Sequence, residues 1–331
     1  MIALLTGGGS GFVGRELTRL LKTKGHEVTV VSRQPGPGKI TWARVVLCLT
    51  SHSLQNILFY VIMMLLCFLQ TELESSGLPV CDGAVNLSGE NIMNPLRWWN
   101  DSYKKDLFSS RIDTTKALSG AIASSPSPPR SWVLVSGVAC YQPSLTAQYT
   151  EDSPWTPFDL LSNLVKEWEA AAELPENVAQ TTRQVVIRPG AVLGRDGGAI
   201  KQMWLPFWLG VGGTLGSGRQ PFPWIHVTDL AGIIAHFLET PPEAAPTASP
   251  QVYNGVAPSL NTNYEFTKEF GRILNRSTVF PVPAFMMNAL LGSERAVILT
   301  QGQKVIPKRT LEAGYQYKYP DLSSALKEIV G

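Results

Sequence analysis

The sequence IALLTGGGSGFVG, residues 2–14, decides the fold class of this 331-residue chain. Its apolar start predicts a β-strand over residues 2–5, and the residues from Phe12 onward predict a helix, so the glycines lie in a strand-to-helix turn. Their spacing fits both Gly-x-x-Gly-x-x-Gly and Gly-x-Gly-x-x-Gly. Such a turn points a helix N-terminus at a pyrophosphate, and glycine leaves room where backbone meets phosphate. We therefore predict a dinucleotide site here, with contacts from Gly8, Gly11, Phe12, Val13 and Gly14.

The next predicted strand indicates which dinucleotide binds. Residues 27–31 alternate in character and lead into Ser32 and Arg33. A site that prefers NAD has a carboxylate about 20 residues beyond the glycines, where it accepts a hydrogen bond from the ribose 2′-hydroxyl. A guanidinium instead offers a planar fork of donors that matches a phosphate. Ser32 and Arg33 therefore predict contacts to the 2′-phosphate of NADP; the alternative is that Arg33 is a solvated residue at a strand end.

Composition excludes several classes of protein. The net charge is +2 and no charge run stands out, so we expect no nucleic-acid partner. The four cysteines have neither metal-ligand nor disulfide spacing, and the four histidines are scattered. We therefore expect no metal site and a reducing, cytoplasmic location. A first strand at residue 2 also predicts that no signal peptide is cleaved.

The segment 43–71 differs in character from the rest of the chain. Its apolar run 57–69 is shorter than the ~18–20 residues that cross a bilayer, and it is apolar on all sides, unlike a surface helix. Three interpretations are a membrane anchor, a buried helix, or sequence foreign to the protein. We favour the third, as a retained or mispredicted intron, because residues 44–45 fit a splice donor and residues 66–70 fit a pyrimidine-rich tract ending in CAG. Sequencing the transcript across this junction tests the hypothesis, and no membrane association is expected.

Strands and helices alternate again from residue 77. Residues 82–89, 132–137 and 184–188 predict strands, and helices are predicted at about 99–119 and 160–172. This order is typical of an α/β fold, a doubly wound parallel sheet of the Rossmann type. Small residues at the end of the run 82–89 mark the carboxyl edge of the sheet, where such folds bind ligands.

Several motifs together resemble the NAD-dependent epimerase/dehydratase superfamily, in its atypical short-chain dehydrogenase/reductase branch. They are GGSGFVG (8–14), AVNLSGENI (84–92), KEWEAA (166–171), RPGAVLG (188–194), GSGRQ (216–220) and PWIHVTDL (223–230). The tail 302–315 resembles the small C-terminal domain of this group. The resemblance implies an NADP-binding Rossmann domain at 1–240 and a smaller α+β substrate domain at 251–331. It also implies cofactor contacts from Leu87, Ser88, Val192, Asp106 and Arg111; for the last two, a solvated helix face is the alternative.

The wider family uses a Ser or Thr hydroxyl with a Tyr-x-x-x-Lys pair on one helix face. By alignment with the family, Leu161 and Val165 occupy the Tyr and Lys positions, and Lys166 is turned away by about 100°. Ser136 is the catalytic candidate, with a strand-end serine bonded to backbone as the alternative. Water or Tyr141 would then supply a proton.

Two functions remain open at this point. One is an NADP-dependent oxidoreductase that acts on an unidentified small carbonyl or sugar-like compound. The other is a non-catalytic NADP(H)-binding sensor that regulates a partner. In the C-terminal half we further expect a loop over 206–213, and a helix over about 229–239 capped by Thr228 or Asp229.

Overall fold

The computed structural model describes residues 3–32, 39–41, 78–94, 97–240 and 249–331. The predicted contact from Arg33 and the intron hypothesis for segment 43–71 lie outside these residues.

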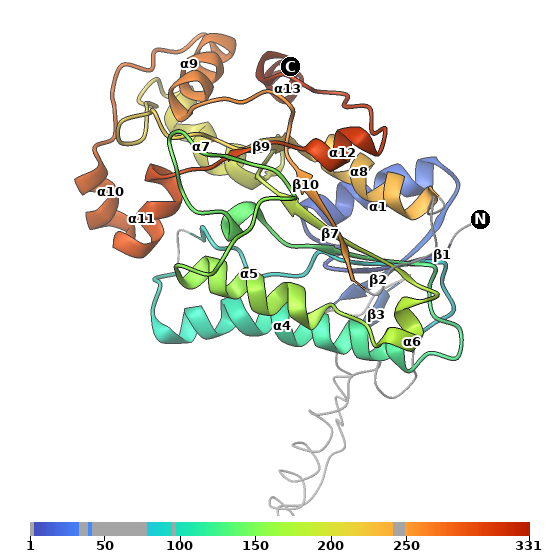
Figure 1. The fold of residues 1–331 in the computed structure, drawn as a ribbon. Coiled ribbons are helices and arrows are strands. Elements are labelled where there is room, and N and C mark those ends of the chain that lie inside the picture. The colour runs from blue at the N-terminus through green and yellow to red at the C-terminus, as the bar shows by residue number, and fades with distance from the viewer. Residues whose placement is uncertain (1–2, 33–38, 42–77, 95–96, 241–248) are drawn as a thin grey trace, which may run out of the picture.

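A parallel sheet of seven strands lies at the centre of the part of the chain that the structure describes (Figure 1). The strand order is β10-β7-β5-β4-β1-β2-β3. The chain adds β2 and β3 on one side of β1 and then crosses to the other side to add β4, as in a doubly wound fold. The predicted fold class is therefore confirmed. The strands are β1 (Ala3–Gly7), β2 (Glu27–Ser32), β3 (Lys39–Thr41), β4 (Gly83–Asn86), β5 (Ser131–Val135), β7 (Arg183–Pro189) and β10 (Gln251–Gly255).

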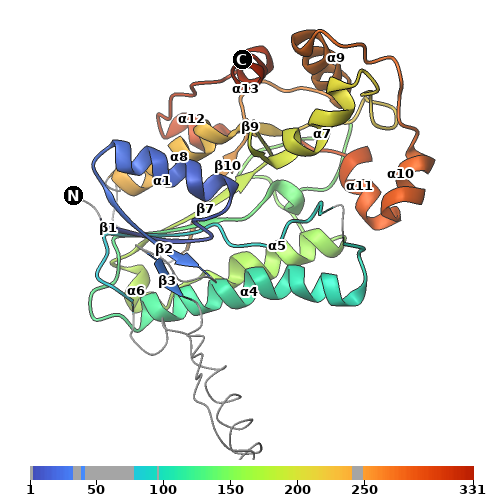
Figure 2. The same ribbon diagram turned by 180° about the vertical axis from the view of Figure 1, so that it is seen from behind.

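Helices cover both faces of this sheet. Figures 1 and 2 show α1 (Phe12–Thr23) and α8 (Val227–Glu239) on one face, and α4 (Asp101–Ala123), α5 (Leu160–Ala171) and α6 (Glu176–Ala179) on the other. Successive strand residues alternate between the two cores: Val133 packs with α1 and α8, whereas Trp132 and Leu134 pack with α4 and α5. This period of two, with both faces apolar, is what a buried parallel strand requires.

The remaining elements gather at one end of the sheet (Figures 1 and 2). Among them, β8 pairs with β9 and β6 pairs with β11, both in parallel. The domain boundary between 240 and 251 stays a prediction, and β10, just after it, belongs to the large sheet. The elements are β6 (Gln148–Tyr149), β8 (Ala191–Gly194), α7 (Gly198–Trp208), β9 (Trp224–His226), α9 (Asn263–Leu274), α10 (Ala284–Leu291), α11 (Ser293–Thr300), β11 (Lys304–Val305), α12 (Lys308–Glu312) and α13 (Leu322–Val330), with a 3₁₀ turn at Val138–Cys140.

Two local predictions were wrong. The loop predicted over 206–213 covers only 209–213, since residues 206–208 belong to α7, where Ile200 and Phe207 are buried despite Pro206. Helix α8 begins at Val227, directly after β9, and its N-cap is His226, whose side chain accepts a hydrogen bond from the backbone N–H of Thr228. Asp229 is instead buried inside the helix, where it binds the C-terminal tail.

Within the described ranges, no helix is both long and apolar enough to cross a membrane.

Candidate dinucleotide site

The glycine turn between β1 and α1 is as tight as the sequence predicts. Gly8 has a φ of +74°, and a Cβ there would lie 2.7 Å from the backbone of Leu87. A Cβ on Gly14 would lie 2.5 Å from the carbonyl oxygen of Gly8. Glycine is therefore required at both positions, since the turn, the first helical turn and the β4 edge touch one another.

The N-terminus of α1 is open to an anion. Its N-cap, Gly11, offers no side-chain acceptor, and no acidic residue lies in the first turn. Arg15 instead adds a positive charge one turn into the helix. A cation at a helix N-terminus opposes the helix dipole, so this arrangement favours a bound negative group.

Residues from neighbouring strands meet at the same edge of the sheet. The backbone N–H of Leu87 donates to the carbonyl of Gly7, and Ser88 follows with its Oγ buried and without a hydrogen-bond partner within the described residues. Ser32 is buried at the carboxyl end of the adjacent strand β2. The structure thus brings Gly8, Ser32, Leu87 and Ser88 to the carboxyl edge, where a doubly wound sheet binds its ligand.

Phe12, Val13 and Val192 connect this edge to the smaller region. The ring of Phe12 lies against the backbone of Gly197, where a Cβ would approach it to 2.4 Å. Val13 and Val192 are partly buried and pack against the core beneath α1 and α8. These contacts place the loop after β8 beside the start of α1.

A cavity of about 480 Å³ opens beside the turn. Arg15, Arg19 and Lys39 make its lining cationic. Arg19 is paired with Glu16 at 2.7 Å, while Arg15 donates to the carbonyl of Ser10. Lys39 lies on β3, in register with Val30 of β2. The complete lining is Gly9, Ser10, Arg15, Thr18, Arg19, Val30 and Lys39.

Sequence reasoning missed Arg15 and Lys39. Arg15 had a detectable signal, because it directly follows the last glycine and the dipole of the helix disfavours a cation there. Lys39 had none, since only the pairing of β3 with β2 brings it to the cavity.

The two candidates on α4 differ in their surroundings. Asp106 is half exposed and forms an ion pair with Arg97 at 2.8 Å. Arg111 lies on the buried stripe of α4, donates to the carbonyls of Leu107 and Glu90, and packs against Gly89. Burial lowers the pKa of Arg111 to about 10. The exposure of Asp106 matches the alternative of a solvated helix face. Arg111 instead lies under the loop that follows β4. The predicted cofactor contacts of both residues stay predictions.

Ser136 directly follows β5, as expected, but its hydroxyl proton already forms a hydrogen bond within the protein. Its Oγ donates to Oε1 of Glu169 at 2.8 Å. Arg188 in turn donates to both carboxylate oxygens of Glu169, at 2.9 and 2.7 Å. Burial disfavours the charge on Arg188, but the hydrogen bonds and charge of Glu169 outweigh it and raise the pKa of Arg188. The hydroxyl of Ser136 therefore keeps acceptor lone pairs but no free proton, and its contact with a substrate stays a prediction.

The helix position at which the wider family has a lysine lies among apolar side chains. Val165 is buried in a cluster with Val138, Cys140 and Tyr141. The hydroxyl of Tyr141 donates to Asn254 and accepts from Arg188, and burial raises its pKa to about 12. With this hydroxyl fully bonded and buried, the geometry argues against Tyr141 as a proton source and leaves water for that role.

Comparison with known proteins agrees with the fold and the motifs. The model of the NAD dependent epimerase/dehydratase family matches residues 3–64, and that of a domain of unknown function (DUF1731) matches residues 282–329. Epimerase family protein SDR39U1 from Bos taurus is 53% identical over 328 residues, covering 99% of each chain. Epimerase family protein YfhF from Bacillus subtilis is 31% identical over 323 residues, covering 98% of this chain and 96% of that protein. The chain belongs to this epimerase family.

A solved structure of the same family supports the overall arrangement. The crystal structure of human epimerase family protein SDR39U1 (isoform 2) with NADPH has a TM-score of 0.86 and 52% sequence identity, covering 99% of each chain. The resemblance inferred from the motifs is therefore confirmed. The second family model spans helices α10 to α13 and includes the tail 302–315.

Proposed function

We propose that this member of the epimerase family binds NADPH at the glycine turn. The observation that carries the proposal is the combination of an uncapped helix N-terminus with a cationic cavity beside it. The first suits a pyrophosphate, and the second suits a further phosphate on the adenosine ribose. Support also comes from the human relative, which was crystallised with NADPH.

Arg15 and Lys39 are the residues we assign to the 2′-phosphate, together with the predicted contacts Ser32 and Arg33. The charge of Arg19 is already neutralised by Glu16, so Arg19 contributes less to the binding of a phosphate. Because each charge-assisted bond to a phosphate contributes ~1.5–3 kcal/mol, losing one cation should weaken NADPH binding by at least ~10-fold. NADH lacks that phosphate, so its affinity should change little.

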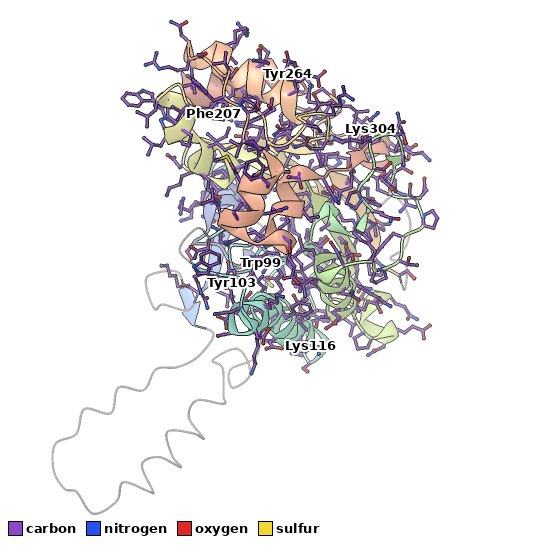
Figure 3. All side chains as sticks on the ribbon, turned by 90° about the vertical axis from the view of Figure 1, so that its left-hand side faces the viewer. Trp99, Tyr103, Lys116, Phe207, Tyr264 and Lys304 are labelled. Atoms are coloured by element: carbon purple, nitrogen blue, oxygen red, sulfur yellow. The ribbon has the colours of Figure 1, made fainter. Side chains whose placement is uncertain are left out.

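Titration calorimetry with NADPH and NADH tests this assignment. We expect the chain to prefer NADPH, and Arg15→Glu and Lys39→Glu to reduce that preference. Lys116→Glu is the matched control, since Lys116 is an exposed lysine of α4 on the other face of the sheet (Figure 3). Equal affinity for both nucleotides, or an equal effect of the control, would refute the assignment.

We further propose an NADP-dependent oxidoreductase activity on an unidentified small carbonyl or sugar-like compound, with Ser136 as the substrate contact. Because Ser136 donates to Glu169, its free lone pairs suit the hydroxyl form of the substrate, that is, the alcohol side of the redox couple. The second candidate is a non-catalytic NADP(H) sensor that regulates a partner. The apolar packing of Val165 favours that candidate, because a buried valine cannot lower the pKa of a catalytic acid.

Absorbance of NADPH at 340 nm, followed in the presence of a panel of carbonyl compounds and of NADP⁺ with the matching alcohols, separates the two candidates. An oxidoreductase should show turnover that Ser136→Ala reduces without weakening NADPH binding. Tight NADPH binding with no turnover in either direction would favour the sensor.

A further inference from the structure

Helix α10 consists of seven apolar residues and one polar residue, Asn288, yet most of it is exposed. Residues 277–292 contain no charged side chain. Of the eight residues of α10, only Met287 is buried, while Phe285 is 72% exposed and Leu290 is 66% exposed. A helix that is apolar all round is normally covered by other protein or by lipid.

The apolar surface continues from α10 onto the segment that follows α7. Arg276 donates to the carbonyl of Trp208 at 2.7 Å, and the N–H of Val282 donates to the carbonyl of Thr214 at 2.8 Å. These bonds hold residues 208–216 alongside residues 276–283. We call the combined surface the apolar face; it consists of Trp208, Leu209, Val211, Val279, Phe280, Phe285, Met286 and Leu290, each at least 43% exposed.

This face lies at the outer edge of the molecule. Figures 1 and 2 both place α10 at the periphery, with α11 between it and the helices of the large sheet, and Figure 3 looks onto that side. On the inner side, Arg295 of α11 is buried and donates to the carbonyls of Ile92 and Asn94. The hairpin of α10 and α11 is therefore anchored through α11, while α10 stays uncovered.

The size of the face suits a stable interface. Its eight residues together expose roughly 700–1,200 Å² if the ~150–250 Å² of an aromatic side chain is taken as the full area of each. The largest apolar patch on a typical monomer is ~300–600 Å², and a standard protein interface buries ~800 Å² on each partner. The apolar face is therefore larger than the largest patch of a typical monomer and about as large as one side of a standard interface.

We propose that the apolar face is a homodimer interface, covered by a second copy of this chain. The eight side chains of the apolar face are uncharged, and the adjoining Arg276 is held by the carbonyl and the ring of Trp208. Two copies can therefore meet around a two-fold axis with few charged groups to desolvate. A membrane is the less suitable occupant, because helices that lie on a bilayer carry Lys and Arg along their polar face, and residues 277–292 have neither. Each copy would place Phe285 and Leu290 near the centre of the contact.

Sedimentation velocity of the full chain between ~1 and ~100 µM tests the proposal, since this range covers dissociation constants in the micromolar region. We expect a dimer that dissociates on dilution. Phe285→Glu and Leu290→Glu, measured separately, should each raise the dissociation constant at least ~30-fold, since each places a charge at a fully desolvated position. Circular dichroism and thermal unfolding at low concentration would verify that both variants fold.

Leu311→Glu is the matched control, because Leu311 is 46% exposed on α12, beside α8 and away from α10 in both ribbon views. It should leave the dimer unchanged. A monomer at every concentration, a dimer that survives both α10 substitutions, or an equal effect of the control would overturn the proposal. So would a monomer that floats with phosphatidylcholine/phosphatidylserine vesicles and loses that binding on Leu290→Glu, which would assign the face to a membrane.

Discussion

Replacement of Glu169 by alanine should destabilise the protein strongly. Glu169 accepts three hydrogen bonds, two from Arg188 and one from Ser136. The side chain of Arg188 is only 5% exposed, and it also donates to the hydroxyl of Tyr141. Glu169→Ala would therefore leave a guanidinium charge buried without a counter-ion.

The expected magnitude follows from that geometry. Removal of one partner of a buried ion pair costs ~3–5 kcal/mol of unfolding free energy, whereas replacement of both partners by apolar residues costs far less. At roughly 2 °C per kcal/mol for a chain of this length, Glu169→Ala should lower the melting temperature by ~6–10 °C. Glu167→Ala, on the exposed side of the same helix, should change stability by no more than ~0.5 kcal/mol.

Urea unfolding of a double-mutant cycle provides the measurement. The cycle combines Glu169→Ala with Arg188→Met, and the double variant should be more stable than the sum of the single effects predicts by ~2 kcal/mol. The reasoning would be refuted if Glu169→Ala cost under ~1 kcal/mol, or if the two substitutions were additive.

Three further predictions concern other parts of the molecule. Gly14→Ala should abolish NADPH binding in calorimetry, because its Cβ would lie 2.5 Å from the Gly8 carbonyl; Gly120→Ala in α4 meets nothing within 4 Å and should add ~0.5–1 kcal/mol of stability instead. Burial raises the pKa of Cys81 to about 11 and that of Cys140 to about 12, so both hold little thiolate at pH 8. Mass spectrometry should find them labelled by maleimide only after unfolding, and native labelling would contradict this. Asp229→Ala should lower the free energy of unfolding by ~2–4 kcal/mol and expose the tail to limited proteolysis. The substitution removes the acceptor for three donors, which are the N–H groups of residues 318 and 319 and the hydroxyl of Tyr315. An unchanged cleavage pattern would argue against it.

The glycine turn illustrates what local sequence can predict. Its spacing between an apolar run and an amphipathic helix required backbone contacts that only glycine permits, and the structure has them at Gly8 and Gly14. The strands were predictable for a similar reason, since continuous apolar runs such as 132–135 need a sheet buried on both faces. Both inferences depend on neighbours in the chain.

The cap of α8 illustrates where such reasoning fails. Asp and Thr are preferred N-caps, so the local sequence predicts Thr228 or Asp229 at this position. The helix instead begins earlier, because β9 leads directly into it, and Asp229 is used by a tail almost 90 residues away. A local propensity was overridden by a distant donor.

The sequence by itself determined the strand-to-helix turn, the parallel α/β sheet and the absence of a Tyr-x-x-x-Lys pair from the helix at 160–171. These depend on residue type and on spacing within one or two turns of helix or one strand. Only the tertiary structure decided that Lys39 lines the cavity, that Ser136 donates to Glu169, and that α10 stays uncovered. The physical reason is that a charge, a hydrogen-bond direction and an exposed face are settled by atoms that strand pairing and helix packing bring together from distant parts of the chain.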